Sequence, residues 1–144
     1  MKTPLPIDAQ SQHGEPRPIR LAGFDPVLAL LRAEGLAEFA LALWAYYAFG
    51  GSWLLFGILF LAPDLSMVGY LINPRIGARL YNLAHTYLAP ALLVPAGFML
   101  AIPVLHALAL IWAAHIGFDR LLGFGLKYPV AFGATHLSGK GARA

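Results

Sequence analysis

The chain has 144 residues, of which 59% are hydrophobic and only 12% are charged, and its formal net charge is +3. A soluble domain of this length cannot bury so much apolar surface, so the composition predicts a protein that exposes apolar side chains to lipid. The absence of cysteine excludes disulfides and thiolate metal sites, and the scatter of basic residues over loops and tails argues against a nucleic-acid partner.

The N-terminal segment, residues 1–27, is rich in proline, glutamine and charged residues. It contains no apolar run that would serve as a secretory signal. Such a composition buries too little surface to offset the entropy lost when a backbone is ordered. We therefore expect an uncleaved, disordered tail on the cytoplasmic side.

Four apolar stretches follow, each close to the roughly 20 residues that a helix needs to cross the hydrocarbon core. Turn residues separate them: Gly50–Ser52 follow the first stretch, and Asn73 and Pro74 follow the second. Pro90 and Pro95 lie inside the third stretch and predict a kink there. The expected spans are residues 28–49, 53–72, 80–100 and 103–122.

The C-terminal segment, residues 123–144, opens with the amphipathic string GFGLKYPVAFGATHL. This string is too polar for a span and too apolar for a free tail. We expect it to lie along the cytoplasmic interface, where it would cover the inner ends of the spans.

Lysine and arginine predict the orientation of the spans. They flank the start of the first span, the connection between the second and third, and the end of the fourth, and the other two connections have none: Lys2, Arg17, Arg20, Arg32, Arg75, Arg79, Arg120, Lys127, Lys140 and Arg143. Because basic loops stay in the cytoplasm, both termini are expected there. The sequence thus predicts an all-α, polytopic membrane protein, an antiparallel four-helix transmembrane bundle.

Ionisable residues interrupt the apolar stretches, and all except His106 lie in the cytoplasmic half of the bilayer. With a rise of about 1.5 Å per residue, the depths from the cytoplasmic boundary are about 12 Å for Glu38, Asp64 and His115, about 9 Å for His85, and about 6 Å for Glu34 and Asp119. A charge in mid-bilayer costs on the order of 3 kcal/mol. These side chains are therefore expected to face one another or water.

Three interpretations of this cluster stay open. The first is a metal or acid/base site, because carboxylates and imidazoles suit Zn, Fe or Mn, although the Glu-x-x-His pattern of four-helix carboxylate sites is absent. The second is a structural polar network in a non-catalytic membrane subunit. The third is a proton or small-solute pathway, which the lack of ionisable groups in the outer half disfavours.

The first interpretation assigns a role to each residue. The candidate metal ligands, or acid/base groups without a metal, are Asp64, His85, His115 and Asp119. Glu38 is a further candidate catalytic group, as a fifth ligand or a partner of the ligands. The supporting residues are Glu34, Asn82, Arg120, Lys127 and His136. A lipophilic small molecule that enters from the inner leaflet would suit such a site, and homo-oligomers are compatible with it.

Two strings carry a resemblance to a known family: PDLSMVGYLINPRIGARLYNLAHTY, from Pro63 to Tyr87, and HIGFDRLLGFGLKYPVAFGATHL, from His115 to Leu137. They resemble the hallmarks of an uncharacterised family of small four-helix proteins of the bacterial cytoplasmic (inner) membrane, a domain of unknown function, over about residues 30–137. The resemblance implies a helical membrane fold but supplies no activity. The residues that match the family's pattern are Asp64, Asn82, His85, His115, Asp119, Lys127 and His136.

Overall fold

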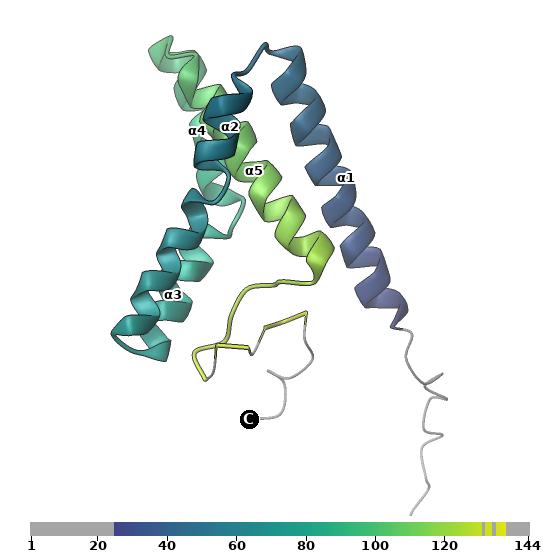
Figure 1. The fold of residues 1–144 in the computed structure, drawn as a ribbon, viewed down its shortest axis with the longest axis vertical. Coiled ribbons are helices and arrows are strands. Elements are labelled where there is room, and N and C mark those ends of the chain that lie inside the picture. The colour runs from purple at the N-terminus through teal and green to yellow at the C-terminus, as the bar shows by residue number, and fades with distance from the viewer. Residues whose placement is uncertain (1–24, 131, 134, 138–144) are drawn as a thin grey trace, which may run out of the picture.

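The computed structural model describes residues 25–130, 132, 133 and 135–137. Within this part the protein is all-helical, as predicted, with five α-helices, one 3₁₀-helix and no strand. The elements are α1 (Pro26–Ala48), α2 (Trp53–Leu59), η1 (Ala62–Leu71), α3 (Pro74–Ala84), α4 (Leu88–Leu100) and α5 (Val104–Leu122) (Figure 1). Most of the expected disordered tail, and the basic residues Lys140 and Arg143, lie outside the described residues.

Helix α1 begins two residues before the expected span, for a local reason. The Asp25 side chain accepts hydrogen bonds from the backbone N–H groups of Val27 and Leu28, at 3.0 and 3.2 Å. Pro26 follows as the first helical residue, where its missing N–H costs nothing. At the other end Gly50 adopts a φ of 68°, which lets the chain turn sharply toward α2.

The second apolar stretch is helical but changes its type along the way. Its first part is the α-helix α2, and its second part is the 3₁₀-helix η1, which has 10 residues. Runs of this type are usually three or four residues long, and long ones often mark strained or functional segments. Pro63 lies near the start of η1, where its missing N–H interrupts the α-helical hydrogen bonds.

The third stretch is not one kinked helix but two helices, α3 and α4, bent by 40° at a break over residues 85–87. The sequence predicts the kink at Pro90 and Pro95, yet both prolines lie within α4. The proline ring clashes with the carbonyl four residues earlier, which for Pro90 belongs to Thr86. The helix therefore breaks one turn before Pro90.

Helices α1 and α5 lie side by side, α4 also packs on α5, and η1 packs on α3 (Figure 1). Glycines allow α1 and α5 to approach closely. A Cβ atom on Gly117 would lie 2.8 Å from the backbone nitrogen of Phe39, and one on Gly35 would lie 2.6 Å from Cβ of Arg120. Without the glycines the two backbones could not reach this separation.

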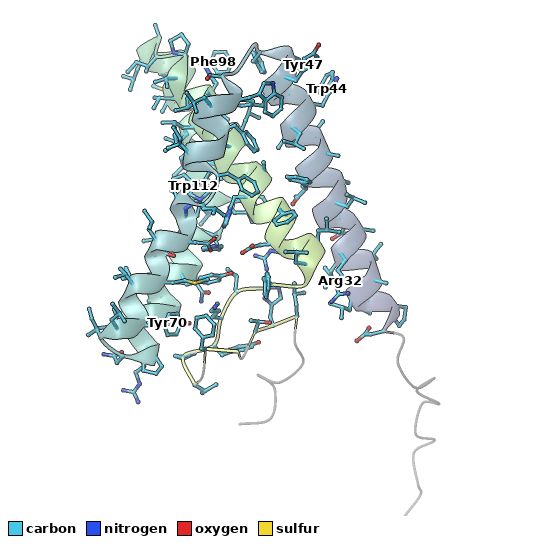
Figure 2. The ribbon with its side chains drawn as sticks, in the orientation of Figure 1. Arg32, Trp44, Tyr47, Tyr70, Phe98 and Trp112 are labelled. Atoms are coloured by element: carbon cyan, nitrogen blue, oxygen red, sulfur yellow. The ribbon has the colours of Figure 1, made fainter. Side chains whose placement is uncertain are left out.

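The helices have the length and composition of a membrane protein. Two segments, Trp53–Leu71 and Val104–Leu122, are long and apolar enough to cross a membrane, and α3 with α4 makes a third if the bent pair is one broken span. Helix α1 has 23 residues but carries Arg32, Glu34 and Glu38. Figure 2 shows Trp44 and Tyr47 toward the α2 end of α1 and Arg32 toward its opposite end. This distribution is typical of a membrane helix whose aromatic residues lie at one membrane–water interface.

Candidate metal centre

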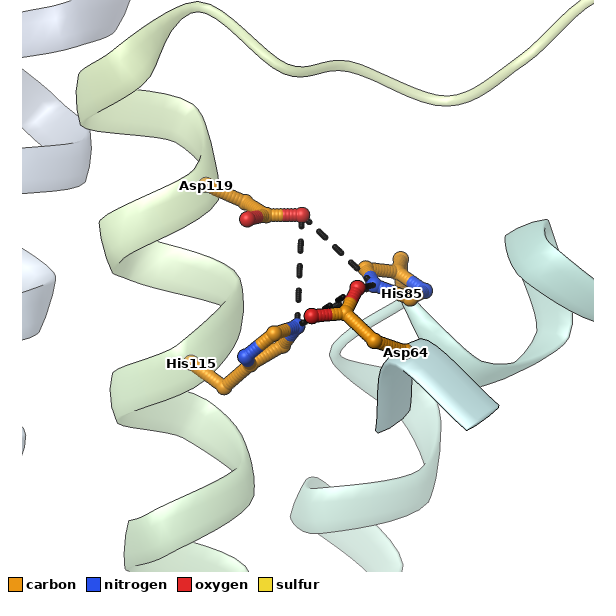
Figure 3. A group of neighbouring side chains, drawn as sticks. All are labelled: Asp64, His85, His115 and Asp119. Atoms are coloured by element: carbon orange, nitrogen blue, oxygen red, sulfur yellow. Dashed lines mark hydrogen bonds and ion pairs between the residues drawn. The ribbon is translucent and has the colours of Figure 1, made fainter. Parts of the chain in front are cut away.

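Four side chains from three separate parts of the chain converge in the interior (Figure 3). Asp64 lies in the first turn of η1, His85 ends α3, and His115 and Asp119 lie one turn apart on α5. One nitrogen or oxygen atom from each residue lies within 4.8 Å of all the others. The structure thus brings together the four residues that the sequence analysis proposes as ligands.

The local sequence explains how each of the four is placed. His85 occupies the break between α3 and α4, so its side chain projects from the C-terminal end of α3 and not from the side of the helix. Asp64 directly follows Pro63, where the second stretch turns into a 3₁₀-helix. Since His115 and Asp119 are four residues apart on α5, they project from the same face of that helix.

The distances between the converging atoms are close to those between the ligand atoms around a small metal ion. Nε2 of His85 lies 3.1 Å from Nε2 of His115, and 3.4 and 3.5 Å from the nearest carboxylate oxygens of Asp64 and Asp119. Nε2 of His115 lies 3.6 and 4.0 Å from the same two oxygens. Four ligands at the usual Zn–N and Zn–O distances form a tetrahedron with edges of about 3.3 Å.

The two imidazoles are buried, and one hydrogen bond fixes the tautomer of His85. Its Nδ1 lies 2.9 Å from the backbone oxygen of Tyr81, which can only accept, so Nδ1 carries the proton and Nε2 presents its lone pair to the cluster. This is the arrangement by which proteins orient a metal-binding histidine. The side chains of His85 and His115 are 3% and 2% exposed, and that of Asp64 is 35% exposed, so the cluster is most open at Asp64.

Tyr81 is the site residue that the sequence analysis does not assign. Its hydroxyl donates a hydrogen bond to Oδ2 of Asp119 at 3.0 Å, and its ring stacks on that of His85 with centroids 3.7 Å apart. Tyr81 and His85 are four residues apart, so the helical spacing already placed them on one face. The partner of the hydroxyl, on α5, is visible only in three dimensions.

The segment after α5 runs from the end of that helix toward α3 (Figure 1) and is fastened to it. Asn82 donates to the backbone oxygen of Lys127 at 2.9 Å and accepts from its backbone nitrogen at 2.7 Å. The buried Nζ of Lys127 lies 4.4 Å from the ring centre of Tyr81 and 3.5 Å from that of Phe132. Burial lowers the pKa of Lys127, and the nearby Asp119 and Asp64 act in the opposite direction.

Arg120 joins this segment to the cluster. Its guanidinium lies 3.3 Å from Nε2 of His136 and donates to the backbone oxygen of His85 at 3.4 Å. Burial lowers the pKa of His136, and the positive charge of Arg120 lowers it further. Arg120 and His136 therefore support the position of the His85 backbone rather than contributing to the four converging atoms.

The two glutamates of α1 do not join the group. Glu34 is exposed, and Glu38 accepts a hydrogen bond from the hydroxyl of Tyr87 at the start of α4. The sequence suggests Glu38 as a fifth ligand or a partner of the ligands. The structure gives it Tyr87 as a partner instead.

The donor set determines what the cluster could bind. Two carboxylates and two neutral imidazoles carry a formal charge of about −2, which a divalent cation neutralises. Imidazole nitrogen and carboxylate oxygen suit Zn, Fe and Mn. Four such ligands complete a tetrahedral zinc site, whereas a metal that takes six ligands would keep positions for water or substrate.

Comparisons with known proteins agree with the resemblance seen in the sequence. The chain matches the family described as "Domain of unknown function (DUF4260)" over residues 28–139. No match was found among curated proteins or among solved structures. All four converging residues, the supporting residues and Tyr81 lie within the matched range.

Proposed function

Since the chain belongs to this family of unknown function, we propose an activity from the site alone: the protein is an integral membrane protein that binds one divalent metal ion, Zn, Fe or Mn. The ligands are Asp64, His85, His115 and Asp119. The site lies in the cytoplasmic half of the bilayer.

The observation that carries this proposal is the convergence of four ligand atoms, among which the two Nε2 atoms lie 3.1 Å apart. Without a metal, this contact is an ordinary hydrogen bond from the Nε2–H group of His115 to the Nε2 lone pair of His85, and such a bond leaves the two nearby carboxylates uncompensated. A metal ion instead accepts a lone pair from each nitrogen. It also offsets the two carboxylates, whose charges would otherwise be costly in a buried site.

A metal that takes more than four ligands would keep a position open here and would supply Lewis-acid chemistry. The side chains around it divide the remaining work. Tyr81 orients Asp119 by a hydrogen bond and His85 by stacking, and the backbone oxygen of Tyr81 fixes the tautomer of His85. Asp64, the most exposed ligand, lies where a substrate would approach. Such a site suits hydrolysis or isomerisation of a lipophilic substrate.

We further propose that the chain crosses a bacterial cytoplasmic membrane four times, as an antiparallel bundle with both termini inside the cell. The four passes are α1, α2 with η1, α3 with α4, and α5. Arg75 and Arg79, in the first two turns of α3 next to the connection between the second and third passes, support this orientation. The exposed aromatic rings of Trp44 and Trp53 at the first connection support it as well.

A structural polar network in a non-catalytic subunit is the alternative. The hydrogen bond from Tyr81 to Asp119 and the contacts of Asp64 with both histidines favour it, because a fully connected network can fix how helices pack. It differs from a metal centre in one consequence. Removal of one partner leaves an uncompensated buried group, so the protein itself should misfold.

Elemental analysis of the detergent-purified protein, prepared without chelators, tests the proposal. We expect close to one Zn, Fe or Mn per chain in the wild type and loss of that metal in His115→Ala and Asp64→Ala. His106→Ala is the matched control, because His106 lies on the same helix but outside the group, and it should keep the metal. Circular dichroism checks that each variant stays helical.

A metal-free wild type together with collapse of helicity in His115→Ala and Asp64→Ala would refute the metal centre and favour the structural network. Metal that persists in both variants would show that it binds elsewhere.

A further inference from the structure

An apolar cavity of about 430 Å³ lies between η1, α4 and α5. Its volume falls within the range of about 300–1,000 Å³ found for small-molecule pockets. Lining residues include Pro63, Ser66, Ala84, Leu93, Leu108 and Trp112. Figure 2 shows Trp112 in the middle of the molecule, between the two ends of the helices.

None of the four converging residues lines the cavity, but three of its lining residues lie close to them along the chain. Pro63 and Ala84 line the cavity, and each directly precedes a proposed ligand, Asp64 and His85. Ile111 lines it as well and lies four residues before His115 on α5, on the same helix face. A molecule that fills the cavity would therefore end beside the cluster.

One polar atom in this apolar wall lacks a partner. The Oγ atom of Ser66 is buried and has no hydrogen-bond partner among the described residues. By contrast, the indole nitrogen of Trp112, which also lines the cavity, donates to the backbone oxygen of Ala84 at 2.6 Å. Because buried hydroxyls are nearly always paired, Ser66 indicates an occupant with a polar group of its own.

We propose that the cavity holds the single apolar chain of an uncharged lipid ester, the substrate of the metal centre, with the polar end of that lipid near Ser66 and Asp64. Hydrolysis of such an ester would leave a long-chain alcohol. This inference rests on the metal centre proposed above. The apolar wall excludes a charged headgroup from the interior of the cavity, since none of the described residues that line it is charged. Exposed side chains such as Leu92 on α4 and Ile58 on α2 leave the surrounding surface to lipid, from which such a chain can enter.

Trp112 provides a reporter inside the cavity. The chain has three tryptophans, so Trp44→Phe with Trp53→Phe leaves Trp112 as the only one. We would titrate this protein, reconstituted in lipid nanodiscs, with dibromo-octadecanol, whose bromine atoms quench indole fluorescence on contact. Saturable quenching at a low molar ratio of probe to lipid is the expected result.

Two pairs of measurements make the test specific. Leu93→Phe places extra volume in the cavity and should lower the affinity for the probe about 5-fold or more. Leu92→Phe, at the exposed neighbouring position, should leave this affinity unchanged. Ser66→Ala should lower the affinity for dibromo-octadecanol by about 3- to 10-fold, the effect of one hydrogen bond. The affinity for dibromo-octadecane, which has no hydroxyl, should be unchanged.

Metal content, measured on the same samples, separates this inference from the one on which it rests. Metal retained in the Leu93→Phe variant while probe affinity falls supports both. In a control protein with Trp44 as its only tryptophan, quenching should rise linearly with the probe. The same linear rise for Trp112 would overturn the cavity assignment and leave a metal-loaded centre intact. If the wild type purifies without metal and the quenching is still saturable, the cavity binds the probe but is not the substrate site of a metal centre, and the inference is refuted.

Discussion

Tyr81 connects two of the proposed ligands through different parts of its side chain. The hydroxyl bonds Asp119, and the ring stacks on His85. The groups that hydrogen-bond to metal ligands fix the direction of the lone pairs and keep the ligands from rotating. A change that removes the hydroxyl alone therefore separates the orientation of Asp119 from the packing of His85.

Tyr81→Phe should lower metal affinity by about 10- to 100-fold while the fold stays intact, because Asp119 loses the bond that orients it and the ring still stacks on His85. Competition with a coloured chelator measures this affinity.

Tyr87→Phe is the matched control for Tyr81→Phe. It removes a hydroxyl that bonds Glu38, which lies outside the four-residue group, and should leave metal affinity unchanged. Equal losses in the two variants would contradict the specific role of Tyr81 and would return Glu38 to the list of ligands.

At the scale of the elements, the site depends on the contact between α1 and α5. Helix α5 carries His115 and Asp119, and α1 packs along it through Gly35 and Gly117. The atoms that a side chain would meet at both glycines include backbone atoms, which cannot move aside as a flexible side chain can. The spacing of the two helices is therefore fixed by the absence of side chains at these positions.

Gly117→Ala should destabilise the protein by about 1–3 kcal/mol, because the new Cβ would lie 2.8 Å from the backbone nitrogen of Phe39 and must push the helices apart. Thermal unfolding in detergent, followed by circular dichroism, measures the change.

Gly57→Ala is the control for Gly117→Ala, since a Cβ on Gly57 meets nothing within 4 Å. We expect no loss of stability there, and a small gain is compatible with the better helix propensity of alanine. Stability of Gly117→Ala equal to that of the wild type would show that α1 and α5 are not in tight contact in the membrane.

At the scale of the whole molecule, the four-pass topology makes a prediction that the lack of native cysteine renders simple to test. Single cysteines at Phe49 and Ile102 should react with a membrane-impermeant maleimide on intact cells, because both lie in the connections proposed to be outside. Cysteines at Ile72 and Tyr128 should react only after the membrane is permeabilised. All four side chains are at least 40% exposed, so accessibility within the protein does not limit the reaction.

The four-pass arrangement is contradicted if Phe49→Cys is protected in intact cells, since α1 would then not cross the membrane. A cysteine at Ile102 that is protected in intact cells, like the one at Ile72, would instead mean that α3 and α4 form a re-entrant loop rather than a broken span.

The sequence alone was enough to identify an all-helical membrane protein and its family, because both follow from composition and from contiguous strings of residues. It also named Asp64, His85, His115 and Asp119, since the cost of isolated charges in lipid requires ionisable side chains at similar depth to meet. Their role as ligands stays a prediction. Only the tertiary structure revealed the partner of Tyr81 on α5, the pairing of Glu38 with Tyr87, and the cavity with Ser66 in its wall. These depend on distances between segments far apart in the chain, which no local pattern of residues encodes.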